Sequence, residues 1–261
     1  MTTRTYSTLA VAAELAVPVA IVAAWQVWTA GADNPFFPTP VAILEEFREL
    51  WLFAEFERHV LPSLVRIGAG FAIGTVVGVA LGVPLGLWRG ARALAMPHIE
   101  YWRAMPPPAL LPISVVLLND IGDKQKISFI AFFCVFPVLL NTIDGVRGIE
   151  PTLVESARSY RVPAHERIRR LVLPAALPQI VAGMRTSLSL AVIIMVVAEY
   201  FSSTEGVGFV LLDAKNTFRM GPMWAAILLI GVLGYLLNLL FILAERRALA
   251  WHRGWRAATP Q

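Results

Sequence analysis

Charged side chains inside apolar stretches are the residues of this sequence that could do chemistry. Arg103 lies one turn ahead of three successive prolines, and Glu199 lies near the end of another apolar stretch. A charge at the centre of a bilayer costs about 2.5–3.5 kcal/mol or more, so its presence indicates either an ion pair or a pathway for a polar solute. Arg103, Pro107 and Glu199 are therefore candidate residues of a translocation path, with pairing of Arg103 to Glu100 as the structural alternative.

Other charges are placed where they could reach water. Arg66 and Asp144 fall near the ends of apolar stretches. Long side chains in that position extend to the membrane interface. We expect both to be interfacial rather than paired inside the membrane.

Enzyme chemistry is not indicated. The sequence has no Gly-x-x-x-x-Gly-Lys-Ser/Thr phosphate loop, and none of its three lysines follows a glycine. The single cysteine, Cys134, and the four histidines are far apart and form no spaced metal motif. No paired carboxylates and no Ser/His/Asp set stand at a suggestive spacing. We expect no catalytic residue, no metal site and no cofactor in this chain.

The composition indicates a membrane protein. Of the 261 residues, 57% are hydrophobic and 15% are charged, whereas soluble domains carry about 25% charge. A membrane-crossing helix needs about 20 mainly apolar residues. Six stretches meet this requirement, at about 9–30, 60–88, 94–118, 126–146, 176–201 and 222–245. The predicted fold class is an all-α membrane protein with about six transmembrane helices.

The distribution of Lys and Arg predicts the orientation of these helices. With both termini in the cytoplasm, the inner segments hold 13 of these residues and the outer segments hold 6. Cytoplasmic loops carry the excess of positive charge, so this orientation is the favoured one. The net charge of +4 then reflects topology, and no nucleic-acid partner is needed to explain it.

The first 58 residues form a separate region. After the first predicted span, Thr39 is placed to cap a helix with Pro40 at its first position. Apolar residues then recur at helical spacing, which predicts a helix lying on the outer membrane surface, with a soluble connector as the alternative. We divide the chain into this region, a helical core at 59–250 and a cytoplasmic tail at 251–261.

A glycine repeats every four residues through the second predicted span. The row consists of Gly70, Gly74, Gly78, Gly82 and Gly86, and Gly90 continues the spacing. Such a row leaves a groove that another helix backbone can approach closely. Because four residues advance about 400°, the row drifts by about 40° per step and would follow a crossing partner. We expect helix packing rather than contact with solute.

Prolines 106 to 108 interrupt the third predicted span. They remove three backbone donors and do not fit inside a regular helix. Broken backbone at membrane depth is tolerated only against protein or a water-filled cavity. The sequence leaves both possibilities open.

A basic, proline-punctuated segment at about 147–175 separates two spans on the predicted cytoplasmic side. Pro151 suits the first turn of a short helix, and Pro163 forces Val162 out of helical geometry and starts a second helix. The result is a helix–turn–helix hairpin with charge around a small apolar face. Such an element fits a helix-in-groove docking surface, and contact with anionic lipid headgroups is the alternative.

The residues of this hairpin resemble the EAA loop in permeases of bacterial ATP-binding cassette importers. Glu155-Ser156-Ala157, position 161 and "LVLP" at 171–174 follow the order of that loop. The resemblance extends through "PSLVRIGAGFAIGTVVGVALGVPLG", "RAMPPPALLPISVVLL", "IGDKQKI", "FPVLLNTIDGVRGIEP" and "VAEYFSSTEGVGFVL". It covers most of residues 60–212 and is closest to the nitrate/sulfonate/taurine branch.

The resemblance implies a permease of the MetI-like fold in the bacterial inner membrane, working as two identical copies. It implies two cytoplasmic ATPase subunits, which bind ATP and Mg, and an extracytoplasmic solute-binding protein. The implied ATPase-coupling residues are Glu155, Ser156, Ala157, Arg158, Ser159, Tyr160 and Arg161. The implied substrate is a small anion such as a sulfonate, taurine or nitrate, or a related small organic compound.

Position 161 departs from the family pattern, which usually has glycine there. A glycine at this point serves a left-handed helix end, and a residue with a side chain costs about 1–2 kcal/mol in that conformation. Either the turn at Arg161 differs in shape, or a partner offers acidic groups to the arginine. A different class of function, an ATP-independent secondary transporter or channel, also suits broken helices and buried charge, although no inverted repeat is evident.

Overall fold

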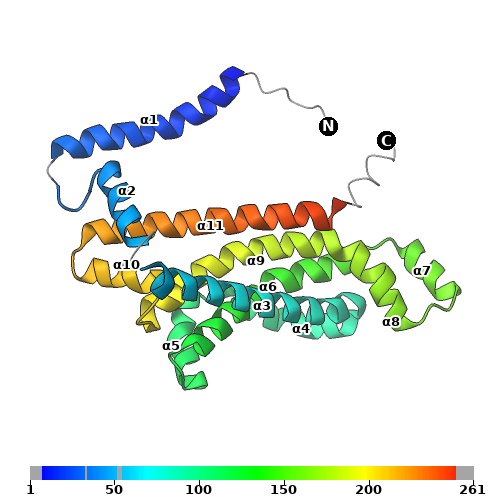
Figure 1. Cartoon of the computed structure of the whole chain (residues 1–261). Helices are drawn as coiled ribbons and strands as arrows, with labels where there is room; N and C mark the ends of the chain where they lie inside the picture. Colours follow the sequence, from blue (N-terminus) through cyan, green and yellow to red (C-terminus); the bar gives the residue numbers. More distant parts are fainter. Residues whose placement is uncertain (1–7, 33, 52–54, 251–261) are drawn as a thin grey trace.

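The computed structural model describes residues 8–32, 34–51 and 55–250, and within these ranges the regular elements are all helices. The predicted tail at 251–261 lies outside the described residues. In chain order (Figure 1) the helices are α1 (Thr8–Ala32), α2 (Pro40–Glu49), η2 (Phe56–Val60), α3 (Leu61–Leu87), α4 (Arg89–Ala104), α5 (Pro107–Leu118), α6 (Asp123–Arg147), α7 (Pro151–Ser159), α8 (Ala164–Arg167), η3 (Ile168–Val172), α9 (Leu173–Ser202), α10 (Val207–Asn216) and α11 (Met220–Ala248).

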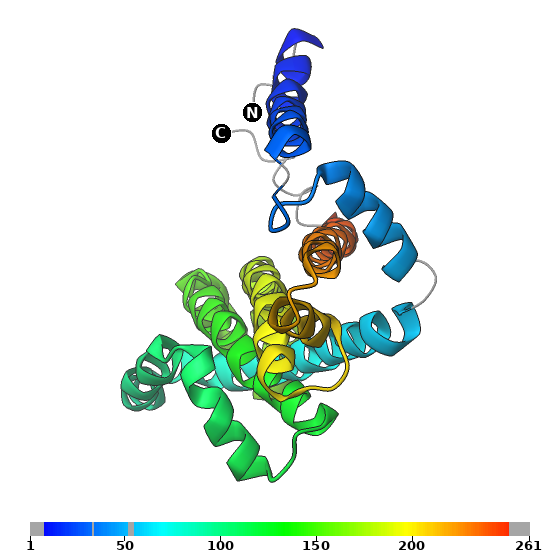
Figure 2. The same cartoon turned by 90° about the vertical axis from the view of Figure 1, so that its left-hand side faces the viewer.

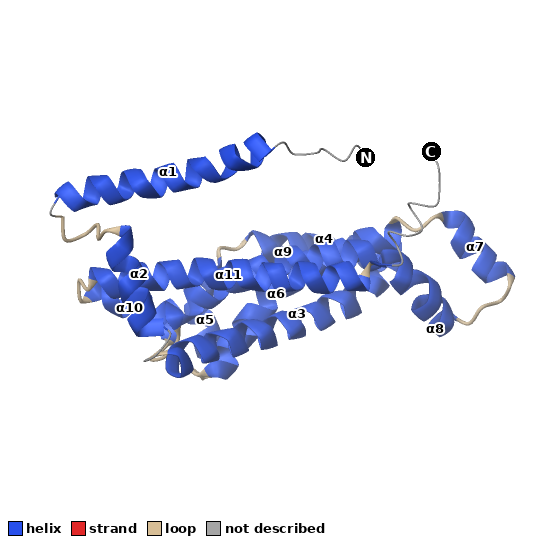
Figure 3. Ribbon diagram, turned by 45° about the horizontal axis from the view of Figure 1, so that its top comes forward, coloured by secondary structure: helices blue, strands red, loops and turns tan. Residues whose placement is uncertain are grey.

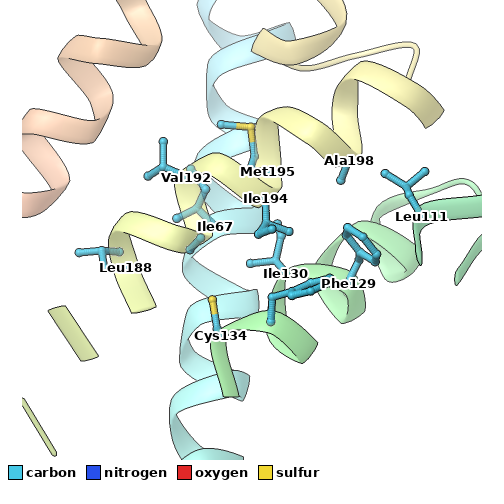
Figure 4. Close-up of a cluster of buried hydrophobic side chains, with 12 residues drawn as sticks. Ile67, Leu111, Phe129, Ile130, Cys134, Leu188, Val192, Ile194, Met195 and Ala198 are labelled. Carbon is cyan, nitrogen blue, oxygen red and sulfur yellow. The ribbon is translucent and has the colours of Figure 1, made fainter. Parts of the chain in front are cut away.

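Helix α6 is the centre of the bundle, and it packs along both α3 and α9. Ile67 of α3, Ile130 and Cys134 of α6, and Met195 of α9 meet in one buried cluster (Figure 4). Lipid tails are as apolar as these side chains, so close packing rather than escape from water holds the helices together.

Four of the described helical segments are long and apolar enough to cross a membrane: Phe56–Leu87, Asp123–Arg147, Ala164–Phe201 and Met220–Ala248. Ala16–Ala32 of α1 and all of α5 are apolar but shorter. The third predicted span, 94–118, divides into α4 and α5 at the prolines, and the predicted interruption is confirmed. Met105 and Pro106 have extended backbones, with ψ of 130° and 127°, and α5 leaves the break at an angle to the bundle (Figure 2).

Two long helices begin with a π turn followed by proline. η2 leads into Pro62 of α3, and η3 leads into Pro174 of α9. At the second junction the N–H of Leu173 donates to the carbonyl of Ile168, five residues earlier. A proline ring clashes with the carbonyl four residues before it. We attribute the wide turns to this clash, since the same Val-Leu-Pro order starts both helices.

The bundle has two distinct ends. The end of α11 and the α7–α8 hairpin lie at one end, while α2 and α10 lie at the other (Figures 1 and 3). At that second end, the hydroxyl of Thr39 accepts the N–H of Ala42 at 3.2 Å, and Pro40 is the first residue of α2. The predicted start of this helix is confirmed.

Candidate functional site

The α7–α8 hairpin turns through a tight, doubly hydrogen-bonded helix end. The N–H of Arg161 donates to the carbonyl of Arg158 at 2.8 Å, and the N–H of Val162 donates to that of Ala157 at 3.0 Å. These two bonds are the pattern of a Schellman ending, in which the residue after the cap is left-handed. Arg161 has a φ of 54°. The predicted helix–turn–helix is confirmed, and Arg161 keeps the left-handed conformation instead of changing the shape of the turn.

The left-handed Arg161 has a counterpart at the opposite end of the molecule. Phe218, with a φ of 55°, follows α10 in the same way. Its N–H donates to Lys215 O at 3.2 Å, and the N–H of Arg219 donates to Ala214 O at 2.8 Å. Each left-handed side chain costs about 1–2 kcal/mol. The two helix ends therefore form a natural pair for comparison.

The hairpin presents its side chains to the surroundings. None of the α7 residues is buried, and Tyr160 at the turn is 84% exposed. The hydroxyls of Ser156 and Ser159 donate to carbonyls of their own helix, at 2.8 and 3.1 Å. Glu155, Arg158 and Arg161 are exposed. The hairpin extends beyond the bundle (Figure 3), so it offers a free, mixed-charge surface to a partner.

A buried joint fixes this hairpin to the bundle. Val172 at the end of η3 and Ala176 of α9 pack against Val83 of α3 and Val146 of α6. From Ala164 to Phe201 the helix runs on without interruption. The free surface of α7 is thus attached to a rigidly packed base.

The path candidates at the α4–α5 break are accessible. Arg103 donates to Glu100 Oε2 at 2.5 Å, and the two side chains are 53% and 48% exposed. Pro107 is half-buried at the first position of α5. Beside the break, Met105 and Trp102 line a mainly apolar cavity of about 360 Å³ that extends along α5 and α6. The paired alternative for Arg103 is present, and its path role stays a prediction.

Glu199, the third path candidate, is fully buried. Its carboxylate accepts hydrogen bonds from Arg66 Nη1 at 2.6 Å, from Ser63 Oγ at 2.8 Å and from the N–H of Gly208 at 3.0 Å. Charge-assisted bonds of this kind offset the cost of burying a carboxylate. Its path role also stays a prediction, because the carboxylate has no exposed surface in this chain.

Arg66 corrects an expectation from the sequence. Its side chain is buried between helices, at 4% exposure, and besides Glu199 it binds Asp123 Oδ1 through Nε at 2.6 Å. The expectation considered only how near Arg66 is to the end of its span. Asp144, placed at the interface on the same argument, is 63% exposed and lies 3.6 Å from Arg147.

Gly206 and Gly208 allow the backbone at the start of α10 to lie directly against the Glu199 side chain. Gly206 has a φ of 115°, and a Cβ there would lie 2.3 Å from Glu199 Cδ. A Cβ on Gly208 would lie 2.8 Å from Glu199 Cβ. Two glycines at seven and nine residues after an intramembrane glutamate were the sequence signal for this site, and our reading of the sequence did not use it.

The glycine row of α3 lies against α6. A Cβ on Gly70, Gly74, Gly78, Gly82 or Gly86 would meet, in order, Ile130, Cys134, Val138, Thr142 and Val146 at 2.5–2.9 Å. The partners advance by four residues, as the glycines do, so one helix contacts the row over its whole length. Gly90 has no atom within 4 Å of its Cβ position and lies outside the contact.

Asp120 caps the start of α6 outside the spans. Its carboxylate accepts the N–H of Gly122 at 2.9 Å and that of Gln125 at 3.2 Å. The bond from Gly122 is the main cause of a lowered pKa of Asp120. In the described part of the chain, no group of three or more His, Cys, Asp and Glu side chains could hold a metal ion.

Residues 74–249 match the family model described as binding-protein-dependent transport system inner membrane component. The chain is similar to a putative aliphatic sulfonates transport permease protein of Bacillus subtilis, with 33% identity over 92% of this chain and 88% of that one. A permease of the same description from Escherichia coli is 35% identical over 90% of each chain.

Among solved structures, the fold is similar to a chain of the MetNI methionine ABC transporter in an inward-facing conformation. The TM-score is 0.63 and the identity 20%, covering 72% of this chain and 94% of that one. This likeness concerns the fold.

Proposed function

The chain belongs to the family of binding-protein-dependent transport system inner membrane components, and we propose that its α7–α8 hairpin docks in a groove of a cytoplasmic ATPase subunit. It is a multi-pass permease subunit of an ATP-binding cassette importer and has no ATPase site of its own. Its family implies ATPase and solute-binding partners. The specific partners we propose are a second copy of this chain, two ATPase subunits that bind ATP and Mg, and one solute-binding protein.

The exposed hairpin is the observation that supports this proposal. Glu155, Arg158 and Arg161 surround the half-buried Ala157 on a helix with no buried residue. A short helix of this kind fits a groove better than it fits a flat headgroup layer, because it projects past the ends of the neighbouring helices (Figure 1). Docking of this surface links the ATPase to the packed start of α9.

The orientation we propose puts this end of the bundle in the cytoplasm. The end of α11 lies at the hairpin end, and α1 runs from that direction toward α2 (Figure 1), in agreement with the excess of Lys and Arg in the inner segments. Both termini are then cytoplasmic, and α2 and α10 face the solute-binding protein.

The substrate class we propose is a small sulfonate-like anion. The support comes from the two sulfonate permeases to which the chain is similar. Arg103 is the candidate to meet such an anion, because its half-exposed side chain stands next to the α4–α5 break. Replacing Arg103 by alanine should abolish uptake of ethanesulfonate in the reconstituted complex while ATP hydrolysis continues.

Docking is tested by reversing a charge on the hairpin. The chain should co-purify with an ATPase subunit, and Glu155→Arg should lower ATP hydrolysis coupled to transport while membrane insertion is unchanged. Glu45→Arg, an exposed position on α2 at the opposite end, is the matched control for membrane insertion and for co-purification with the ATPase subunit, and it should leave both unchanged. Solute movement by the purified chain alone in liposomes would refute the proposal and favour an ATP-independent transporter.

A further inference from the structure

One continuous helix joins the hairpin to the buried charges at the opposite end. The segment Ala164–Phe201 has 38 residues, which corresponds to about 57 Å of helix. Its first turns form α8 and η3 at the hairpin, and its last turns carry Glu199. A rigid element of this length is a physical route for coupling between two distant sites.

The bend in this helix is supported by packing. The chain changes direction near η3 and Pro174, so that α8 is angled away from α9 (Figure 1). Val172 is 1% exposed and Ala176 is fully buried at this point, both packed against α3 and α6. A bend held in a close-packed cluster transmits displacement instead of absorbing it.

Glu199 is unfavourably placed for its own helix. It lies in the last turn of α9, where a negative charge opposes the helix dipole. Its carboxylate faces the first turn of α10, where the dipole favours a negative charge. The electrostatics of Glu199 therefore favour a link between elements over the stability of α9.

Three N–H groups at the start of α10 donate to acceptors in other elements. The N–H of Gly206 donates to His59 Nδ1 at 3.0 Å, that of Val207 to Ser63 Oγ at 3.1 Å, and that of Gly208 to Glu199 at 3.0 Å. Ser63 also donates to Glu199. These bonds connect α10 to η2, α3 and α9, and Arg66 extends the connection to Asp123 at the start of α6.

We propose that Glu199 is a positioning residue through which α9 moves α10 and α3 together when the ATPase acts on the hairpin. This inference rests on the proposed function, because it requires that movement of the ATPase reaches this chain through the α7–α8 hairpin. Arg66 and Ser63 hold the carboxylate in place. The outer ends of α3, α9 and α10 then move as one body.

The test measures movement of α10 in the reconstituted complex, so that no knowledge of the solute is required. A spin label at Asn216→Cys, an exposed site on α10, reports the distance between the two copies in a Cys134→Ala background. We expect ATP with Mg to shift this distance in the parent protein. In Glu199→Gln the shift should be lost while ATP hydrolysis continues, because the amide keeps the shape but loses the charge held by Arg66.

Two further variants complete the design. Asp213→Asn removes the pairing of Asp213 with Arg219 on the surface of α10 and should leave the shift unchanged. Ser63→Ala removes one bond to Glu199 and one to α10 while the ion pair with Arg66 stays, and it should reduce the shift. If Glu199→Gln is not recovered from membranes, Ser63→Ala decides the question.

The outcomes separate the two proposals. An unchanged shift in Glu199→Gln contradicts the positioning role, and where that variant is not recovered, an unchanged shift in Ser63→Ala does so. A parent complex that hydrolyses ATP without any change in distance at position 216 also contradicts it. A parallel loss of hydrolysis and shift in the deciding variant also contradicts it, since that result indicates only a structural role. Failure of the parent chain to bind an ATPase overturns the proposed function instead.

Discussion

Replacing Gly82 by alanine puts a methyl group where α6 already has one. The new Cβ would lie 2.6 Å from Thr142 Cβ and 2.7 Å from its Cγ2. Carbon atoms pack at about 3.5–4.0 Å, so the two helices must separate locally by roughly 1 Å. Overpacking of this kind costs about 1–3 kcal/mol.

The helix itself would gain from the substitution. Alanine is better than glycine inside a helix by about 0.5–1 kcal/mol. The net expectation for Gly82→Ala is a destabilisation of about 1–2 kcal/mol. For a chain of this size, that corresponds to a decrease in Tm of roughly 2–8 °C.

The single cysteine provides the assay. Cys134 is fully buried, so a thiol-reactive dye reports unfolding of the purified protein in detergent. Gly68→Ala, on the same helix and with no atom within 4 Å of its Cβ position, is the matched control and should raise Tm. Adding Thr142→Gly to Gly82→Ala moves the small residue to the other helix and should recover part of the loss.

Two results would refute this reasoning. If Gly82→Ala unfolds at or above the temperature of the parent protein, as Gly68→Ala is expected to, the row does not limit the approach of α6. If Thr142→Gly fails to recover any stability in the double variant, the cost of Gly82→Ala has another origin than the contact with Thr142.

Two other predictions concern helix ends. Arg161→Gly should stabilise the end of α7 by about 1 kcal/mol, because it removes a side chain from a left-handed residue. Phe218→Gly should do the same for α10, and slower amide hydrogen exchange in each helix is the measurement. No change in either variant would contradict the backbone strain at these two residues. Because the pKa of Asp120 is lowered in the folded chain, its cap stabilises α6 above the ordinary carboxyl pKa and is lost as pH falls through the lowered value. The Tm difference between the parent protein and Asp120→Asn should therefore be largest near neutral pH and vanish in acid, and a difference that persists in acid would contradict this cause.

The hairpin could be predicted from the sequence because local rules determine it. Pro151 and Pro163 fix where the two short helices begin, and these rules need no knowledge of the rest of the chain. The glycine row was readable for a similar reason, since its spacing places all its members on one side of a helix. What the sequence did not provide was the identity of the opposing helix.

The buried ion pair could not be predicted by the same rules. Arg66 and Glu199 are separated by 133 residues, and each lies near the end of its own span. Distance from a span end indicates how easily a side chain can reach water, but it does not show whether a neighbouring helix offers a partner. The break at prolines 106–108 was foreseen, whereas the sequence could not give the direction that α5 takes after it.

The contact between α3 and α6 has a consequence for how the two helices find their alignment. Both sides repeat every four residues, so sliding α3 by one repeat, about 6 Å, would still match four of the five glycines with a neighbour of the same set. A periodic contact of this kind allows more than one alignment of the two helices, so the spacing alone does not fix their register. Arg66 removes the degeneracy, because only one alignment brings it to Asp123 at the start of α6. The ion pair of Arg66 with Asp123 thus helps to fix the register that the repeating contact alone leaves open.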